Sequence, residues 1–390
     1  MIGIDLGVKM KESLPVNKEI LKWARLSIGL TIDEVAVKMN KDIIVINEWE
    51  AGVSAPTYSQ LEKLAYSIYK RPVAIFFFPD IPSEATPKVE FRTLPDTIID
   101  NLPPEIIRQY RKAKVYQLNL NELYNSEKPV RNSILNKFKL TGSEDIAKVA
   151  SEVRAFLGVT LDDQYKFGSI DIAFKAWRNA FENNGIFVFK DAFHNDDYSG
   201  FCIYDDKYPV ILINNSMPHS RQIFTLFHEL AHLLLHSGGI DFRNINITEF
   251  FKGIYHNYES LCNRFAGEFL VPAKVFRENI LDVSEKNIRH LADRFSVSRE
   301  VILRYYLNLK LIDEQYYHDM ADKWIVEANK IKEESEGGHY YYTQKSYLGD
   351  KYINIAFSKY YQKQISAEHL SEYLNIKVNK ISTFEHYALG

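Results

Sequence analysis

The sequence predicts an α+β protein that is mainly α-helical, with a small β-sheet in the middle of the chain. Three observations lead to this expectation. Near the amino terminus, short segments with apolar residues three and four positions apart are separated by Gly and Asn. Between residues 185 and 214, three runs rich in Val, Ile and Phe are separated by polar turns. Beyond residue 216 the helical spacing returns, so the strands occupy one central stretch.

Composition limits the broad class of the protein. With 390 residues, 46% of them hydrophobic, the chain can form two or three domains with substantial cores. The net charge of −3 gives no overall basic field that would require a nucleic-acid partner. Only two cysteines occur, Cys202 and Cys262, both in apolar surroundings, which indicates a reducing compartment. The sequence has no signal-like start and no run of 18 apolar residues, so we expect a cytoplasmic protein without membrane contact. We expect no internal repeat.

Residues 15–78 are predicted to form a first, all-helical domain. Four short helices are expected, over residues 17–28, 31–39, 42–49 and 57–69. The turn after the second helix and the sequence after the third resemble the Cro/C1-type helix-turn-helix, in which the third helix enters the major groove of DNA. Lys41 and Asn47 are the residues suited to contact DNA there.

The charge of this domain does not decide whether its partner is DNA or protein. Eight basic and seven acidic side chains lie between residues 15 and 72, which is a weak basic excess for phosphate contacts. The domain is therefore interpreted either as an operator binder that is weak or depends on a homodimer, or as a helix-turn-helix scaffold that contacts protein.

The next three regions are assigned from composition and periodicity. Residues 79–142 are predicted to be a proline-containing linker followed by an amphipathic helix, with residues 91–95 either docked on a neighbouring domain or simply extended. Residues 143–312 contain two helices, then strands over 185–190, 200–204 and 209–214, then further helices. An exposed edge of this sheet could bind an extended peptide by strand addition. Residues 313–390 are expected to form a helical carboxyl-terminal domain.

An apolar helix expected over residues 224–236 carries the chemistry. It contains His228, Glu229 and His232 in the pattern His-Glu-x-x-His. Since residues four apart share a helix face, the two imidazoles can point at one position, with Glu229 about 100° round the helix. The odds of such a match by chance are roughly 0.02 in this chain. Burying these side chains without a partner would be costly, so the pattern predicts a zinc site with an adjacent general base rather than structural histidines.

The sequence also predicts where this helix begins and ends and what role its further histidine has. Ser216 is the expected N-cap, and Gly238 with Gly239 is expected to end the helix. His236 lies about 12 Å of helix rise from His228, whereas the ligands of a tetrahedral ion lie about 3.3 Å apart. His236 is therefore expected to be a neighbour of the site and not a ligand.

The third metal ligand must come from another segment. A second amphipathic helix, over residues 258–272, offers Glu259, which is far enough beyond His232 for a loop and a helix to return (259 − 232 = 27 residues). His256, one turn earlier, is the alternative ligand. Glu268 is half a turn out of phase and is expected to face away. Asn263, one turn after Glu259, can orient a ligand.

These two helices resemble those of the ImmA/IrrE family of zinc metallopeptidases. The family pattern is a His-Glu-x-x-His helix followed by E-x-x-A-N-x-F-A and L-x-P, and here the second part reads E-S-L-C-N-R-F-A, with Cys262 in place of alanine. The resemblance implies that His228, His232 and Glu259 bind zinc and that Glu229 is catalytic. It also implies a zincin-like metallopeptidase domain over residues 143–312, in a subgroup that carries an amino-terminal helix-turn-helix.

The function implied is cleavage of a regulatory protein. Members of the resembling family cleave repressors of the helix-turn-helix type or are encoded beside a toxin gene, so the expected substrate is a repressor, antitoxin or toxin partner. The competing interpretation is a non-catalytic regulator or antitoxin that binds DNA or a toxin and has a structural metal site.

Overall fold

The computed structural model describes residues 14–69, 71–82, 99, 102–130, 133–242, 254–333 and 339–390. The chain forms two compact units, Met1–Pro87 with Asp96–Tyr110, and Lys88–Pro95 with Arg111–Gly390, which divide within helix α7 (Pro104–Leu123). The segment 91–95, for which docking was considered, lies outside the described residues. No helix in the described part of the chain combines the length and apolarity that a membrane crossing requires.

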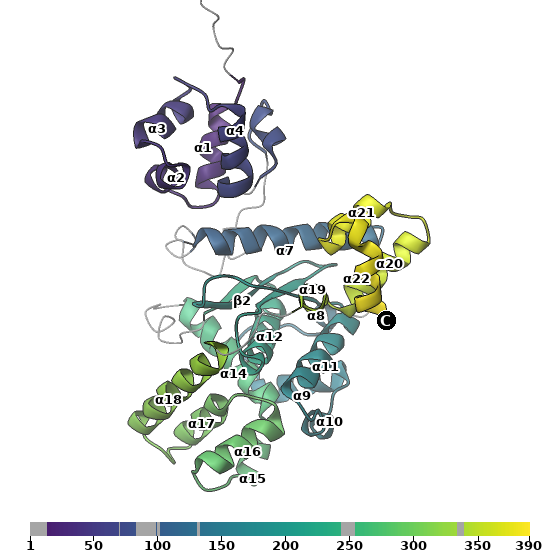
Figure 1. Ribbon diagram of the computed structural model, residues 1–390. Coiled ribbons are helices and arrows are strands. Elements are labelled where there is room, and N and C mark those ends of the chain that lie inside the picture. The colour runs from purple at the N-terminus through teal and green to yellow at the C-terminus, as the bar shows by residue number, and fades with distance from the viewer. Residues whose placement is uncertain are drawn as a thin grey trace, which may run out of the picture. The chain divides into compact units, whose positions relative to one another are not determined.

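The first unit is a helical bundle whose elements fall where the sequence predicts them. It contains α1 (Lys18–Leu26), α2 (Ile32–Met39), α3 (Ile43–Ala51), α4 (Tyr58–Glu62), a π-helical turn η1 (Lys63–Tyr69) and a 3-10 turn η2 (Val73–Phe77) (Figure 1). Thr31 caps α2 in a capping box with Glu34, and Asn40 ends it in the left-handed conformation. The helix-turn-helix geometry of α2 and α3 therefore follows from local signals in the sequence.

The second unit is built on a four-stranded sheet in the order β1-β3-β2-β4. Strands β1 (Phe187–Asp191), β2 (Tyr198–Ile203) and β3 (Val210–Asn214) confirm the three predicted strands, and β4 (Gly239–Phe242) was not predicted. β1 and β3 are parallel, whereas β2 is antiparallel to both β3 and β4.

Helices cover both faces of this sheet. Phe189 of β1 stacks on Tyr116 of α7 with ring centroids 4.0 Å apart, while Val188, on the opposite face, belongs to the large core formed with α11 (Ile170–Asn183) and α12 (His219–Leu234). Figure 1 shows the sheet between α7 and α12. Because both faces are covered, every residue of β2 and β3 is buried, which explains why these strands read as continuous apolar runs.

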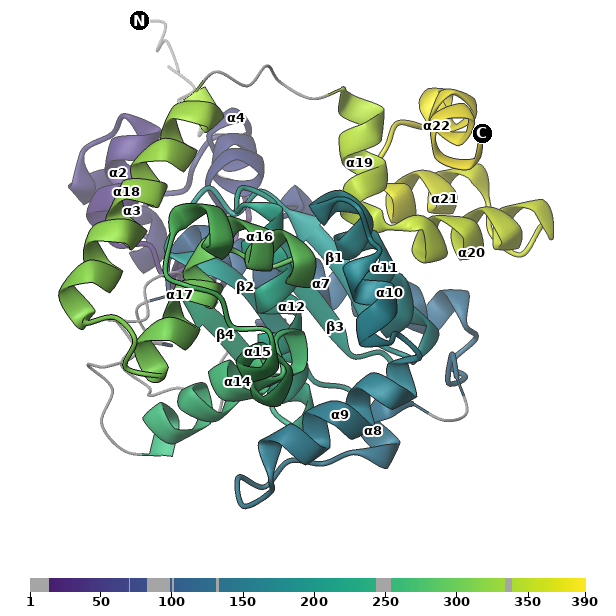
Figure 2. The same cartoon turned by 90° about the horizontal axis from the view of Figure 1, so that it is seen from below.

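The remaining helices surround this core and extend to the carboxyl terminus. They are α8 (Ile134–Lys137), α9 (Ile146–Leu157), α10 (Leu161–Tyr165), α14 (Ile254–Leu270), α15 (Ala273–Glu278), α16 (Glu285–Phe295), α17 (Arg299–Asn308), α18 (Glu314–Glu333), α19 (Tyr340–Leu348), α20 (Asp350–Tyr361), α21 (Ala367–Leu374), a 3-10 turn η3 (Val378–Lys380) and α22 (Ile381–Leu389). In Figure 2, α19 to α22 gather as a group of their own. The predicted α+β class, mainly α, is confirmed.

One local expectation was wrong. Helix α12 begins at His219 after Pro218, so Ser216 is not its cap, and the chain leaves the helix through His236 in the left-handed conformation before Gly238. The outer strands of the sheet are β1 and β4, and Phe187 and Ile240 on them are both 0% exposed. Peptide binding by strand addition stays a prediction.

Candidate metal centre

Two imidazole nitrogens and one carboxylate converge between α12 and α14. His228 Nε2 lies 3.1 Å from His232 Nε2, and the carboxylate oxygens of Glu259 lie 3.3 Å from the first and 3.1 Å from the second. Neighbouring ligands of a tetrahedral zinc ion, with bonds of about 2.0–2.1 Å, are about 3.3 Å apart. Among the described residues, this is the cluster that has the spacing of a metal site.

Apolar packing brings the two helices together. Phe227 of α12 stacks on Phe269 of α14 with centroids 4.1 Å apart, and Phe265 and Leu261 are buried on the same side of α14. This contact directs Glu259 toward the two histidines. The side chain of His256, the alternative ligand, lies outside the described residues. Glu268 is not part of the cluster, and neither is His236, whose ring stacks on Tyr204.

Each histidine ring is positioned by a second contact, apart from the cluster. His228 Nδ1 lies 3.0 Å from Asn263 Oδ1, so Nδ1 donates and Nε2 presents its lone pair to the cluster. His232 packs directly on the backbone of Gly239, where an added Cβ would lie 2.7 Å from His232 Nδ1. Only glycine can occupy this position without displacing the ring.

Glu229 is the unusual member of the motif. It is 0% exposed, and no nitrogen or hydroxyl of the described residues donates a hydrogen bond to either carboxylate oxygen; the donor beside it is the weak thiol of Cys202. Burial raises the pKa of Glu229 to about 7, although His232 and His228 oppose this shift. A buried carboxylate with so weak a donor is costly, so a further group, such as an ion with its water, would stabilise it.

A buried aspartate adds charge next to the cluster. Asp241 of β4 accepts two hydrogen bonds from Arg221 Nη2, at 2.7 and 2.9 Å, and one from Thr225 Oγ1 at 2.7 Å. Burial alone would lower the pKa of His228, but Asp241 and Glu259 raise it to about 9. Without an ion this imidazole therefore carries a second proton at neutral pH, and a bound metal would displace it from Nε2. Burial alone would raise the pKa of Glu259, but His232 and His228 lower it to about 2. The carboxylate is therefore ionised at neutral pH, as a metal ligand must be.

Comparison with known proteins agrees with this geometry. Residues 181–305 match the IrrE N-terminal-like domain, and residues 21–65 match a helix-turn-helix. The chain carries an IrrE N-terminal-like domain. The predicted resemblance to the ImmA/IrrE family, with its amino-terminal helix-turn-helix, is thereby confirmed. The two domains together are those of a DNA-binding regulator with a protease-like domain.

The other comparisons add little. No curated protein matches the chain. A Mycobacterium tuberculosis transcriptional regulator of known structure is 16% identical with a TM-score of 0.29, and the match covers 49% of this chain and 51% of that one. The chain thus spans about half the length of that regulator.

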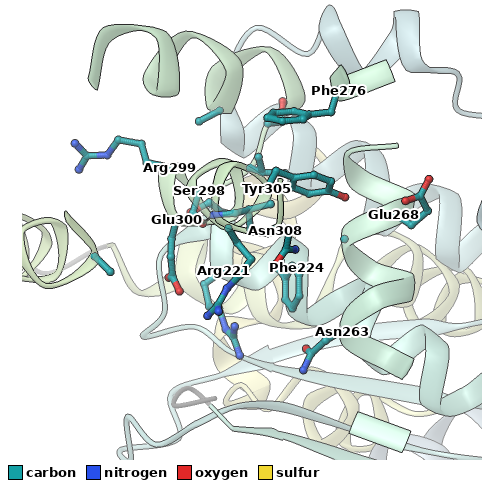
Figure 3. Close-up of a pocket in the computed structure, with 18 of the residues that line it drawn as sticks. Arg221, Phe224, Asn263, Glu268, Phe276, Ser298, Arg299, Glu300, Tyr305 and Asn308 are labelled. Carbon is teal, nitrogen blue, oxygen red and sulfur yellow. Dashed lines mark hydrogen bonds between the residues drawn. The ribbon is translucent and has the colours of Figure 1, made fainter. Parts of the chain in front are cut away.

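A groove opens on one side of the IrrE N-terminal-like domain (Figure 3). It encloses about 2110 Å³, well above the roughly 300–1,000 Å³ of a small-molecule site. Glu259 and Asn263 line it from α14, Arg221 and Phe224 from α12, and Tyr305 from α17. Glu259 is the one member of the metal cluster that lines the groove, because His228 and His232 lie behind it at 1% and 0% exposure.

The predicted DNA-contact residues lie at the surface of the helix-turn-helix. Lys41 in the turn and Asn47 of α3 are both exposed, and Asn47 Nδ2 donates to the Ile43 carbonyl. The acidic residues of this region are engaged elsewhere. Glu50 forms two hydrogen bonds with Arg25, at 2.7 and 2.8 Å, and Asp42 caps α3. These carboxylates therefore repel DNA phosphates less than the count of charges suggests.

Sequence reasoning missed Asp241 and Gly239. Both lie on β4, which is too short and too polar to be recognised as a strand. A usable signal was present on α12, because Arg221 and Thr225 continue the stripe of His228 and His232 at helical spacing. A polar stripe on so apolar a helix indicates that a buried counter-charge faces it.

Proposed function

We propose that this chain is a zinc-dependent endopeptidase, fused to a helix-turn-helix, that cleaves a regulatory protein. The observation that supports this most strongly is the cluster of three ligand residues, whose donor atoms lie 3.1–3.3 Å apart, with the buried carboxylate of Glu229 beside it. The cluster supplies the ligands, and Glu229 supplies a base.

The donor set fits zinc. Two neutral imidazoles and one carboxylate, with one position left for water or substrate, are the ligands of catalytic zinc in proteins. His228, His232 and Glu259 would hold the ion, which when bound would polarise a substrate carbonyl and acidify a water. Glu229 would take the proton from that water and deliver it to the leaving amine. Asn263 would keep His228 in the tautomer that offers Nε2 to the ion.

The groove indicates the kind of substrate. Its volume suits a polypeptide segment, and Glu259 and Asn263 lie in its wall. In this groove the peptide would lie along α14 and α17. The fusion to a helix-turn-helix favours a target from the same regulatory circuit, such as a repressor, an antitoxin or a toxin partner.

The helix-turn-helix supports DNA binding as a second activity. We propose that Lys41 and Asn47 are the contacting residues, since both are exposed donors at the start of and along α3. A homodimer would double the number of phosphate contacts that this weakly charged domain can make.

One observation favours the competing function, a non-catalytic regulator with a structural metal site. His228, Glu229, His232 and Glu259 are all at most 2% exposed. A structural zinc is closed in this way, whereas a catalytic zinc needs a position that substrate can reach.

The proteolysis test uses proteins encoded by the neighbouring genes as substrates, each co-expressed with the full chain. We expect Glu229→Gln to retain one zinc per chain and to lower cleavage by about 10²–10⁴-fold, because the ligands remain and the base is lost. His232→Ala should lose the zinc. Glu152→Gln, at an exposed position of α9 outside the groove, is the matched control and should cleave normally. Cleavage that persists in Glu229→Gln, or wild-type protein that binds zinc and cleaves none of these proteins, would favour the non-catalytic regulator.

A further inference from the structure

The end of the chain resembles the helix-turn-helix of the first unit. α21 has eight residues, as α2 has. Ser366 caps α21 by accepting a hydrogen bond from the His369 amide at 3.3 Å, and Thr31 caps α2 by accepting one from the Glu34 amide at 3.2 Å. The two helices therefore share their length and their type of cap.

The turns after the two helices have the same geometry. Asn375 ends α21 with φ 49° and ψ 49°, and Asn40 ends α2 with φ 54° and ψ 53°. The next amide closes each turn in the same way, since Ile376 N donates to Ser371 O and Lys41 N donates to Ala36 O, both at 3.0 Å. An asparagine tolerates this left-handed conformation, so the same residue type sets the same bend twice.

The buried side chains follow the same register. In the first unit Val35, Met39, Ile46 and Trp49 are at most 5% exposed. The corresponding residues at the end of the chain are Leu370, Leu374, Ile381 and Phe384, which are at most 9% exposed. The equivalent of α3 is the turn η3 followed by α22. α20 packs mainly on α21 and more sparsely on α22, whereas α1 packs on α3.

The pair α16 and α17 has the same turn. Ser296 ends α16 in the left-handed conformation, Val297 N donates to Ala292 O at 2.9 Å, and Leu291, Phe295 and Ile302 are buried in the same register. α16 differs in having 11 residues, where α2 and α21 have eight. Turn geometry alone therefore does not distinguish the last pair, whereas its exposed side chains do.

The exposed side chains of the second copy suit DNA better than those of the first. Lys377, Asn379, Lys380 and Ser382 are exposed at the start of η3 and α22, and no acidic residue occurs from 376 to 384. Lys and Ser donate to phosphates, and Asn can bind the edge of adenine in the major groove. Each copy also exposes apolar side chains at this point, Val378 at 45% in the second and Ile43 and Ile44 at 38% and 61% in the first.

We propose that α20, α21 and η3 with α22 form a second helix-turn-helix that binds duplex DNA. Lys377 and Lys380 contact phosphates, and Asn379 and Ser382 face base edges in the major groove. These exposed donors at the leading end of the third helix favour DNA over a protein partner.

The test measures binding of the full chain to a fluorescein-labelled, mixed-sequence 30-base-pair duplex by anisotropy between 50 and 200 mM salt. Lys377→Ala with Lys380→Ala should weaken binding on the order of tenfold and reduce the slope of log Kd against log salt by about 1.8, since each phosphate contact contributes about 0.9. The matched control is Lys166→Ala with Lys175→Ala, which removes two exposed lysines from α10–α11 and should change neither quantity.

Two further variants separate the two helix-turn-helix units. Lys41→Ala with Asn47→Ala disables the first, and adding Lys377→Ala with Lys380→Ala to it should weaken binding again. Asn379→Ala, a single surface change, tests the same face if the double lysine variant loses its circular dichroism spectrum. The proposal is overturned if wild-type protein does not bind the duplex. It is also overturned if folded variants of Lys377, Lys380 and Asn379 all bind like the control, in which case this face contacts protein.

Discussion

Replacing Gly239 by alanine tests the metal centre without touching a ligand. The new Cβ would lie 2.7 Å from His232 Nδ1 and closer still to two carbons of the ring. Ordinary contact requires about 3.5 Å or more, so the imidazole must shift by about 1 Å, whereas metal–ligand distances tolerate about 0.2 Å. We expect a 10–100-fold loss of zinc affinity, comparable to the loss of a group that orients a ligand. Overpacking should also cost about 1–3 kcal/mol of stability.

The assay is competition for zinc with a chromophoric chelator, followed by thermal unfolding with and without EDTA. Gly267→Ala is the matched control, because a Cβ there meets only the Tyr305 hydroxyl, at 3.6 Å. Since Gly267 lies inside α14, alanine should stabilise that helix by roughly 0.5–1 kcal/mol and leave the zinc affinity unchanged. If Gly239→Ala bound zinc as tightly as the wild type, His232 could not be a ligand in the position described.

Three further changes probe the surroundings of the site and the first unit. Asn263→Ala should weaken zinc binding 10–100-fold by freeing His228 Nδ1, whereas Ser260→Ala on the same helix should not; equal affinities would exclude the orienting role. Glu50→Ala should destabilise the helix-turn-helix by about 3–5 kcal/mol, because Arg25 is left buried without its partner. Hydrogen exchange of the amides in α1–α3 measures this loss, and unchanged protection would show that the ion pair contributes nothing to stability. Burial lowers the pKa of Lys190 to about 7, from 10.5 in the unfolded chain. Between these two pH values Lys190 is protonated in the unfolded chain and largely neutral in the folded one, so the stability of the wild type rises with pH across that window. Lys190→Met should remove this rise and be the more stable protein at pH 6 by roughly 3–5 kcal/mol, and parallel pH profiles of the two proteins in urea unfolding would contradict it.

The metal cluster was predictable because it depends on short-range spacing. The four-residue interval between His228 and His232 fixes their common face, and the apolar residues around Glu259 define a helix that must return to the core. The helix-turn-helix of the first unit was predictable for the same reason, since Thr31 and Asn40 mark both ends of α2.

Other features could not be predicted, because they depend on contacts between distant segments. The contact of Gly239 with His232 exists only because β4 pairs with β2. The burial of the outer strands also depends on tertiary packing, which periodicity within a strand does not report. The second helix-turn-helix escaped notice because Leu370 and Leu374 match Val35 and Met39 in burial but not in residue type.

Zinc K-edge X-ray absorption of the purified full-length protein tests the central claim most directly. We predict one zinc per chain, bound by two imidazole nitrogens and carboxylate oxygen at about 2.0–2.2 Å, with no sulfur ligand. Cys202 and Cys262 are both buried and free, so a sulfur shell at about 2.3 Å would show that the ion binds elsewhere. Such a shell, or protein that takes up no zinc, would contradict the metal centre formed by His228, His232 and Glu259.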